Sequence, residues 1–272
     1  CYPCDAIVND VISENNGLGY SGTNSGGSLY IISSVFKNNK GGLAPNTLDS
    51  ELLPPERETF IIGNLIENNN NVDAPATQST NLSLGNGVVI AGGNNNIIKN
   101  NVIANHNLYG VIITATADVN YWPAHGNRVE SNLIINSKRA DIASSGLSNL
   151  GNCFENNYFN TSIPPGLQTL NNCDSSFYPL SADLSGMWSS LARVIQTSDG
   201  NYSQGDWRTF EAPANQPNMP IMDELMSLGY NKTSLPVTKI WSSVKPAVEV
   251  FSQYEDVLEV IELPEEARNY LN

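Results

Sequence analysis

The sequence predicts an all-β protein, a right-handed parallel β-helix (a solenoid) of about six coils with a C-terminal helical cap and an extended tail. The first observation is a short pattern that returns along the chain: an apolar residue, two polar residues, an asparagine and then apolar residues. The second is a glycine with an apolar run after most copies. Repeats of roughly 24 to 37 residues bury their apolar surface by stacking on one another, and they have room for about three short strands each.

The copies align on one polar column and two apolar columns. The clearest copy, 94–114, reads NNNIIKNNVIANHNLYGVIIT. The polar column consists of Asp10, Ser34, Asn64, Asn101, Asn132 and Asn157. The apolar column before it consists of Ile7, Ile31, Ile61, Ile98, Val129 and Phe154. The apolar column after it consists of Ile12, Phe36, Ile66, Ile103, Ile134 and Phe159. We expect both apolar columns to point into one core.

The spacing of the apolar columns predicts a bend at the polar column. The two columns lie about five residues apart, an odd number, so one straight strand cannot point both of them inward. Asparagine tolerates the left-handed backbone conformation that such a bend needs. Stacked asparagine side chains hydrogen-bond to one another in other stacked-strand assemblies, so we expect an asparagine ladder. The right-handed sense follows from the strong preference of parallel crossover connections.

Three insertions interrupt the repeats, at 44–58, 72–85 and 115–125. Insertions in a solenoid project as loops and often form its binding face. The first and the third follow equivalent strands two coils apart. We therefore expect these two loops to flank one surface patch.

A change in composition divides the chain into a predicted β-helix over 1–178 and a C-terminal region over 179–272. In 181–196, apolar residues recur at helical spacing behind a serine or aspartate that can cap a helix. The end of a stack of coils exposes sheet edges and an open core. We therefore expect this helix to cap the solenoid.

The rest of the C-terminal region mixes extended and helical signals. The proline-rich stretch 201–220 predicts an extended segment along the solenoid, anchored by Trp207 and Phe210. Two further helices are expected near 222–228 and 245–261. The β-branched residues of the second also fit a strand, and its apolar face also fits a partner-binding surface.

The charge balance argues against nucleic-acid and anionic membrane partners. Only 15% of the residues are charged, and the formal net charge is −14, whereas phosphate-rich partners require basic clusters. No apolar run approaches the roughly 18 residues of a membrane span. No signal peptide is visible, and the chain is already mid-repeat by Ile7, which indicates a processed or truncated segment. A mature lipoprotein that begins at Cys1 is the alternative.

The four cysteines predict two structural disulfides in an oxidising compartment. Cys153 and Cys173 follow similar Gly-Asn and Asn-Asn openings about one coil apart, so their sulfurs should lie on neighbouring rungs at a separation that suits a disulfide. Cys1 and Cys4 form a C-x-x-C pair that lacks the sequence context of haem attachment or thioredoxin-like redox chemistry. Zinc would need two more ligands, so we expect no metal site and no cofactor.

The repeat I-x-x-N-x-I-x-x-N followed by G-[LV]-x-[IVY] resembles the right-handed parallel β-helix repeat of pectate lyases and of many secreted bacterial proteins. More narrowly, the stretches CYPCDAIVNDV, GNGVVIAGG, LGNCFENNYF and DWRTFEAPANQPNMP resemble an uncharacterised group of secreted bacterial β-helix proteins. The resemblance covers most of 1–220. It implies the fold and further coils before Cys1, and it implies no activity.

β-Helix polysaccharide lyases and hydrolases use acidic clusters and basic side chains on the outer face, which directs attention to the third insertion. Asp118, His125 and Arg128 are the catalytic candidates, because an acid, an imidazole and a guanidinium beside aromatic side chains would suit a uronate sugar. The binding candidates are Tyr121, Trp122, Lys138 and Arg139. His125 is equally compatible with a hydrogen bond within its own loop. A second set, Lys99, Glu130 and Glu155, falls in one column and predicts cross-coil ion pairs.

Two functions fit these observations. The first is a non-catalytic secreted, periplasmic or cell-surface scaffold or binding subunit, alone or in a larger assembly, whose partner is a protein or a cell-surface polysaccharide. The alternative is a carbohydrate-active enzyme, a lyase, hydrolase or epimerase of an acidic polysaccharide. A cleft between the 44–58 and 115–125 loops with converging carboxylates and bases would favour the enzyme, and a plain polar surface would favour the scaffold.

Overall fold

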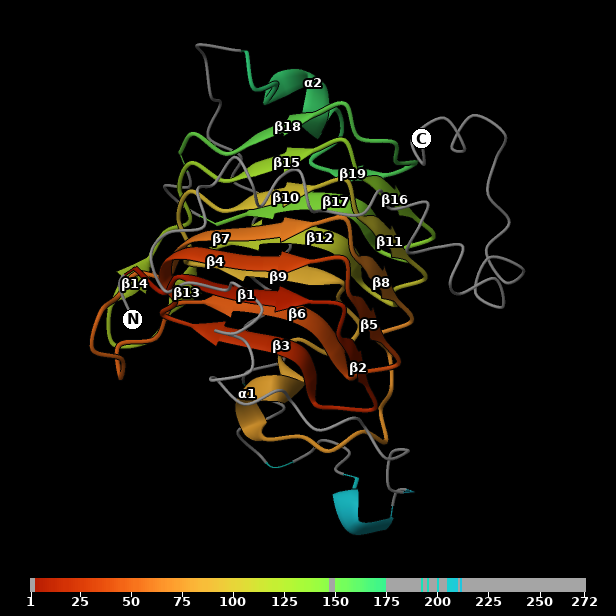
Figure 1. The fold of residues 1–272 in the computed structure, drawn as a ribbon. Coiled ribbons are helices and arrows are strands. Elements are labelled where there is room, and N and C mark those ends of the chain that lie inside the picture. The colour runs from red at the N-terminus through yellow and green to blue at the C-terminus, as the bar shows by residue number, and fades with distance from the viewer. Residues whose placement is uncertain are drawn as a thin grey trace, which may run out of the picture.

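The protein is all-β, with three long parallel sheets and almost no helix (Figure 1). The computed structural model describes residues 3–146 and 150–174, together with residues 192, 195, 200, 205–209 and 211. Within them the chain visits sheet A, sheet B and sheet C in turn, and each strand pairs in parallel with its equivalent in the next repeat. This arrangement is consistent with a parallel β-helix or solenoid.

Each sheet collects one strand from nearly every repeat. Sheet A contains β1 (Ala6–Asn9), β4 (Gly26–Ile32), β7 (Arg57–Ile62), β10 (Ile97–Lys99), β15 (Arg128–Glu130) and β18 (Cys153–Glu155). Sheet B contains β2 (Ile12–Glu14), β5 (Val35–Lys37), β8 (Leu65–Glu67), β11 (Val102–Ala104) and β16 (Leu133–Ile135). Sheet C contains β3 (Leu18–Thr23), β6 (Gly41–Asn46), β9 (Val88–Ala91), β12 (Tyr109–Thr114), β17 (Ala140–Ser145) and β19 (Ser162–Ile163). In the sixth repeat a single parallel bridge from Tyr158 to Leu133 takes the place of a sheet B strand.

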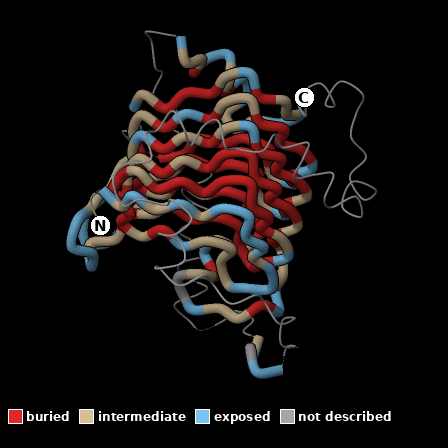
Figure 2. The backbone as a smooth tube through the Cα atoms, in the orientation of Figure 1, coloured by how far each residue is buried: buried red, intermediate tan, exposed pale blue. Residues whose placement is uncertain are grey.

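An apolar core runs along the inside of the stack, and Figure 2 shows a band of buried backbone through successive rungs. Sheet A contributes Ile31, Ile61, Ile98, Val129 and Phe154. Sheet B contributes Phe36, Ile66, Ile103 and Ile134. The two predicted apolar columns therefore meet inside the molecule from the second repeat onward.

In the first repeat the predicted register is wrong by one residue. Val8, not Ile7, pairs with the inward Ile31, and Ser13, not Ile12, pairs with the inward Phe36. Ile7 and Ile12 are accordingly 41% and 49% exposed. Because side chains alternate between the two faces of a strand, a shift of one residue exchanges inside for outside.

The chain bends as predicted, but in the second to sixth repeats the left-handed residue is the one before the predicted polar column. Positive φ angles occur at Asp10, Ser33, Gly63, Asn100, Ser131 and Asn156. In the first repeat the sequence predicts Asp10 in the asparagine column, whereas the register puts Val11 there, one residue before β2. The left-handed residue turns the chain, and this leaves the side chain of the next residue free to point inward.

The inward asparagines form the expected ladder. The Asn64 Nδ2 donates to Asn101 Oδ1 at 3.0 Å, and Asn101 Nδ2 donates to Asn132 Oδ1 at 2.9 Å. Asn132 Nδ2 donates in the same way to Asn157 Oδ1 at 2.9 Å. Each amide oxygen also accepts the backbone N–H of the preceding ladder residue. The ladder thus satisfies buried polar groups at a bend where strand pairing is interrupted.

Two shorter ladders stand at the other bends. In one, Asn127 Nδ2 donates to Asn152 Oδ1 at 2.9 Å, and Asn96 lies one rung below. In the other, Asn39 Nδ2 donates to Asn69 Oδ1 at 3.0 Å, and the buried His106 continues this column. Complete burial lowers the pKa of His106 to about 3, so its neutral ring accepts a hydrogen bond from Asn69.

The last described rung is closed by a short helix and a disulfide. The helix α2 (Leu167–Leu170) places Leu167 in the core, and Gln168 Oε1 accepts from Asn157 Nδ2 at 2.9 Å, which ends the ladder. The sulfurs of Cys153 and Cys173 form the predicted disulfide, with the two Cα atoms 4.9 Å apart. Cys4 is also disulfide-bonded, and its expected partner Cys1 lies outside the described residues.

Most of the predicted C-terminal region lies outside the described residues. This applies to nearly all of the cap helix at 181–196 and to both helices expected beyond 220. Within the stretch expected to be extended, Trp207–Thr209 forms a single 3₁₀ turn, η1. No helix of the described residues is long and apolar enough to cross a membrane.

Removing one member of the long ladder should destabilise the protein strongly. Asn101→Ala leaves the buried N–H of Asn64 and the carbonyl of Ile61 without their partners. We expect a loss of about 3 kcal/mol in the free energy of unfolding, measured by urea denaturation. The matched control is Asn107→Ala, an exposed asparagine of the same repeat, which should change stability by no more than about 0.5 kcal/mol. Equal effects of the two substitutions would contradict the structural role of the ladder.

The disulfide should stabilise the last described rung, because the cross-link lowers the conformational entropy of the unfolded chain. Replacing Cys153 and Cys173 together by serine opens a loop with a sequence separation of 20 residues. The chain-entropy model then gives a loss of about 3 kcal/mol, to be read from urea denaturation without reductant. Hydrogen exchange should rise first at β18 and α2. An unchanged urea midpoint would show that the bridge does not hold this end of the stack.

Candidate functional site

Two inserted loops meet at the side of the molecule where sheet C leads into sheet A (Figure 1). The first joins β6 to β7. The second follows β12 and contains a hairpin of β13 (Thr116–Ala117) and β14 (Tyr121–Trp122). The Asp49 N–H donates to Asp118 Oδ2 at 3.0 Å, and the Asn120 N–H donates to Asp49 Oδ2 at 2.7 Å. The two loops therefore flank one patch, as their equivalent positions in the repeat predict.

Asp49 is the residue that joins the loops. The backbone hydrogen bond from Asn120 is the main cause that holds the pKa of Asp49 below its usual value, and burial only partly opposes it. Gly92 then gives the hairpin room to pack, because a Cβ at this position would lie 2.9 Å from Trp122 Cβ. Gly92 also has a φ of +71°, which favours glycine.

The joined loops expose apolar side chains in one region. Leu52 is 91% exposed and Val119 is 86% exposed, and Leu53 and Tyr121 are partly exposed beside them in the sequence. Each lies within a few residues of the Asp49–Asn120 contact. We call Leu52, Leu53, Val119 and Tyr121 the loop surface. Exposed apolar side chains that gather on one patch are typical of interaction sites, whereas isolated ones are ordinary.

A small cavity of about 250 Å³ opens beside the first loop. Its lining includes Tyr20 and Ser25 from the first repeats and Glu51, Leu52 and Leu53 from the loop. The loop surface and this cavity thus share two leucines. Glu51 is the carboxylate that lines the cavity.

A buried carboxyl group lies behind Ser25. Glu56 Oε1 accepts hydrogen bonds from Thr59 Oγ1 at 2.6 Å and from Ser25 Oγ at 3.3 Å, and Glu56 Oε2 accepts from Asn96 Nδ2 at 2.8 Å. Burial raises the pKa of Glu56 to about 7, although these hydrogen bonds oppose the shift. Glu56 is completely buried, so it has no direct access to a ligand.

Glu56 accepts the hydrogen bond that a main-chain carbonyl accepts from the equivalent asparagine in later repeats. Asn127 and Asn152 donate through Nδ2 to the carbonyls of Gly93 and Ala124, whereas Asn96 donates to the Glu56 carboxyl group. Gly93 leaves room for that group, because a Cβ at Gly93 would lie 2.0 Å from Glu56 Oε2. The sequence did not reveal Glu56, because it lies within an insertion and outside every repeat column.

Among the described residues, no hydrogen bond or ion pair joins the three catalytic candidates to one another. Asp118 accepts from the backbone of Asp49, and Arg128 forms an ion pair with Glu130. His125 Nδ1 accepts the N–H of Leu150 at 3.0 Å. Each candidate is thus held by a different partner, and the His125 ring accepts its hydrogen bond from the next coil and not from its own loop.

The four binding candidates lie in two separate places. Tyr121 and Trp122 belong to the hairpin after the end of β12. Lys138 and Arg139 precede β17 at the opposite end of sheet C, where the Arg139 guanidinium lies 5.6 Å from the ring centroid of Tyr109, at the start of β12. The four candidates thus lie at two ends of sheet C, and a binding role for any of them stays a prediction.

The predicted charge column is present on sheet A. Lys99, Glu130 and Glu155 are in register, and Lys99 Nζ lies 3.1 Å from Glu130 Oε2. Burial favours a higher pKa for Glu130, but the hydrogen bonds from Arg128 and Lys99 hold this pKa below its usual value. Glu130 and Glu155 also lie near Cys173, whose sulfur is in the disulfide and is not a thiolate ligand. Lys99 and Glu130 thus form the cross-coil ion pair of this column, and Glu155 adds a second carboxylate beside Glu130.

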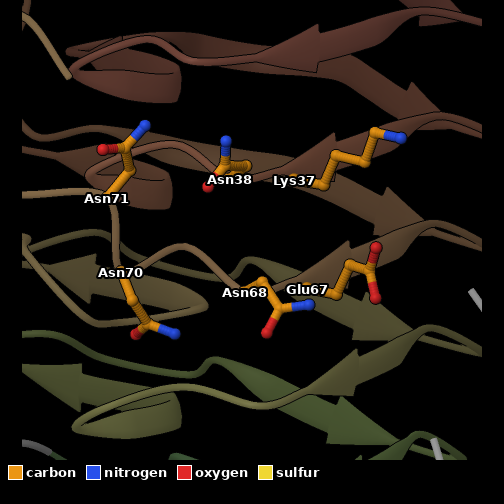
Figure 3. Close-up of a pocket in the computed structure, with 6 residues that line it drawn as sticks. All are labelled: Lys37, Asn38, Glu67, Asn68, Asn70 and Asn71. Atoms are coloured by element: carbon orange, nitrogen blue, oxygen red, sulfur yellow. The ribbon is translucent and has the colours of Figure 1, made fainter. Parts of the chain in front are cut away.

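A second depression, of about 390 Å³, lies over the bend after sheet B (Figure 3). Its lining consists of Lys37, Asn38, Glu67, Asn68, Asn70 and Asn71. Lys37 and Glu67 are neighbours in the register of β5 and β8. Burial raises the pKa of Glu67, although Lys37 opposes the shift. The depression is polar and carries both charges, so it resembles a hydrated surface more than a pocket for an apolar ligand.

Comparison with known proteins finds no matching family model, no matching curated protein and no matching solved structure.

The raised pKa of Glu56 predicts a specific pH dependence. The folded protein binds this proton more tightly than the unfolded chain, whose carboxyl pKa is about 4.5. The resulting stability is complete below pH 4.5 and is lost as the pH rises through about 7. Between pH 4.5 and pH 8 the free energy of unfolding of the wild type should fall by about 3 kcal/mol more than that of Glu56→Gln.

Urea denaturation at a series of pH values measures this difference. In Glu56→Gln the amide nitrogen can donate to Thr59, and the amide oxygen can accept from Asn96, so the neutral network is kept. Glu51→Gln is the matched control, since Glu51 belongs to the same loop and is exposed, and it should keep the wild-type slope. Parallel pH profiles for the wild type and Glu56→Gln would contradict a buried neutral carboxyl group.

Proposed function

We propose that the chain is a right-handed parallel β-helix that acts as a non-catalytic scaffold or binding subunit, secreted, periplasmic or on the cell surface. Three parallel sheets and the buried asparagine ladders support the architecture. The right-handed sense rests on the general preference of parallel crossovers. The disulfides are compatible with an oxidising compartment.

The loop surface is the observation that carries the binding role. Asp49 joins two loops that are far apart in the sequence, and Leu52 and Val119 on these loops are exposed. The acid–base candidates beside it are engaged in hydrogen bonds that position the loops and rungs. Exposed apolar side chains on two joined loops suit binding. Side chains that already accept hydrogen bonds are less available for acid–base catalysis.

The chemistry of the loop surface favours a protein partner with its own apolar patch. Leu52 and Val119 offer no hydrogen bonds to sugar hydroxyl groups, and Tyr121 is the aromatic side chain of the patch. The net charge of −14 disfavours an acidic polysaccharide, which would be repelled at low ionic strength. Protein interfaces are commonly dominated by a few buried apolar and aromatic anchors, a role that these side chains can fill.

Substitution of the loop surface should weaken partner binding without unfolding the protein. The immobilised wild-type chain is used to isolate a partner from extracellular and surface fractions of its source, and the affinity of the purified partner is then measured. Leu52→Asp with Val119→Asp should weaken this affinity by about tenfold or more. Leu170→Asp, an exposed leucine of α2, is the matched control and should bind as the wild type does.

The same preparations test the enzymatic alternative. Acidic polysaccharides incubated with the wild type should give no unsaturated or shortened products. Turnover that disappears in His125→Ala would overturn the scaffold proposal. Binding that survives both aspartate substitutions would also contradict it, because the loop surface would then not be the contact.

A further inference from the structure

The outer face of sheet B carries a continuous apolar stripe. The register places Val35, Leu65, Val102 and Leu133 side by side on β5, β8, β11 and β16. The residues that follow them in each strand point into the core. Because successive side chains of a strand alternate between faces, the four residues of the stripe point away from the core. Ala104 and Ile135 extend the stripe along two strands.

These outward side chains are nevertheless buried in the complete chain. Leu65 is 0% exposed, and Val35, Val102 and Leu133 are each 1% exposed. Ile12 occupies the same column on β2 and is 49% exposed. Neighbouring strands lie beside an outward side chain and not above it. Burial this complete therefore requires another segment that lies over the stripe.

None of the helices or strands among the described residues supplies that segment. The strands of sheet B contact their neighbours in the sheet and, across the core, strands of sheet C. The helix α1 (Gln78–Asn81) belongs to the 72–85 insertion, which packs against Gly17 at the start of sheet C. The hairpin of β13 and β14 lies with the other inserted loop, and α2 lies at the last rung (Figure 1).

We propose that part of the C-terminal segment, residues 212–272, binds to the apolar stripe of sheet B. This is the longest stretch of the chain outside the described residues. The stripe spans four rungs, about 14 Å, a distance that roughly ten residues of helix would cover. The segment offers such stretches: IMDELMSL at 221–228 and an apolar series that includes Val248, Phe251 and Val257. The segment then belongs to the folded β-helix domain.

A photo-crosslinking residue in the full-length chain tests where the segment binds. The residue replaces Val102 in one variant and Val119, which is 86% exposed, in the control variant. Peptide mass spectrometry after irradiation should find crosslinks from position 102 to residues 212–272 of the same chain. Position 119 should give none to this segment. Crosslinks from position 102 only to a second copy of the chain, to another protein or to residues 3–211 would overturn the proposal.

Protease sensitivity gives an independent readout on the full chain. Val102→Asp places a charge under the segment and should raise the rate of cleavage within 212–272 by about tenfold or more. Val119→Asp should leave that rate unchanged. The circular dichroism spectrum shows whether Val102→Asp is folded. If this variant is unfolded, the crosslinking result decides, because that experiment does not introduce a charge. An unchanged cleavage rate in folded Val102→Asp would contradict the proposal.

Discussion

The buried amide ladder at the bend between sheets A and B is the constraint on which the rest of the structure depends. Each left-handed residue turns the chain sharply and interrupts strand pairing there. The asparagine that follows it, such as Asn101, supplies an oxygen to one rung and donates to the next. Only a short side chain with both a donor and an acceptor can do this in the successive rungs from Asn64 to Asn157. The rungs can then repeat at one spacing, and the apolar columns stack.

The position of the loop surface follows from this regularity. The ladders fix where each rung turns, so an insertion at one position of the repeat emerges at the same edge in every coil. The loops before β7 and β15 therefore project side by side, and Asp49 can join them. Below them Glu56 replaces a main-chain carbonyl as the acceptor of a ladder asparagine. The loop surface thus lies near a buried polar network that is centred on Glu56.

The sequence predicts the regular part of the fold because the spacing of its apolar residues sets the register of the strands. From Ile31 onward the inward columns are correct, and so is the Cys153–Cys173 bridge. The first repeat is wrong because Ile7 and Val8 are both apolar and fit either register. The site was harder to predict. His125 finds its partner Leu150 one coil later, and Glu56 lies outside the repeat, so no local pattern reveals either contact.

The most direct test of this account is a double-mutant cycle between Asn101 and Asn132. The two amides form one buried hydrogen bond at 2.9 Å, and each also donates to a backbone carbonyl. Urea denaturation of the wild type, the two alanine variants and the double variant gives the coupling free energy between the side chains. A ladder that acts as a unit predicts a coupling of about 1 kcal/mol or more, with the double variant less destabilised than the sum of the single ones. Additive effects within about 0.3 kcal/mol would show that the asparagines act independently and would contradict the account.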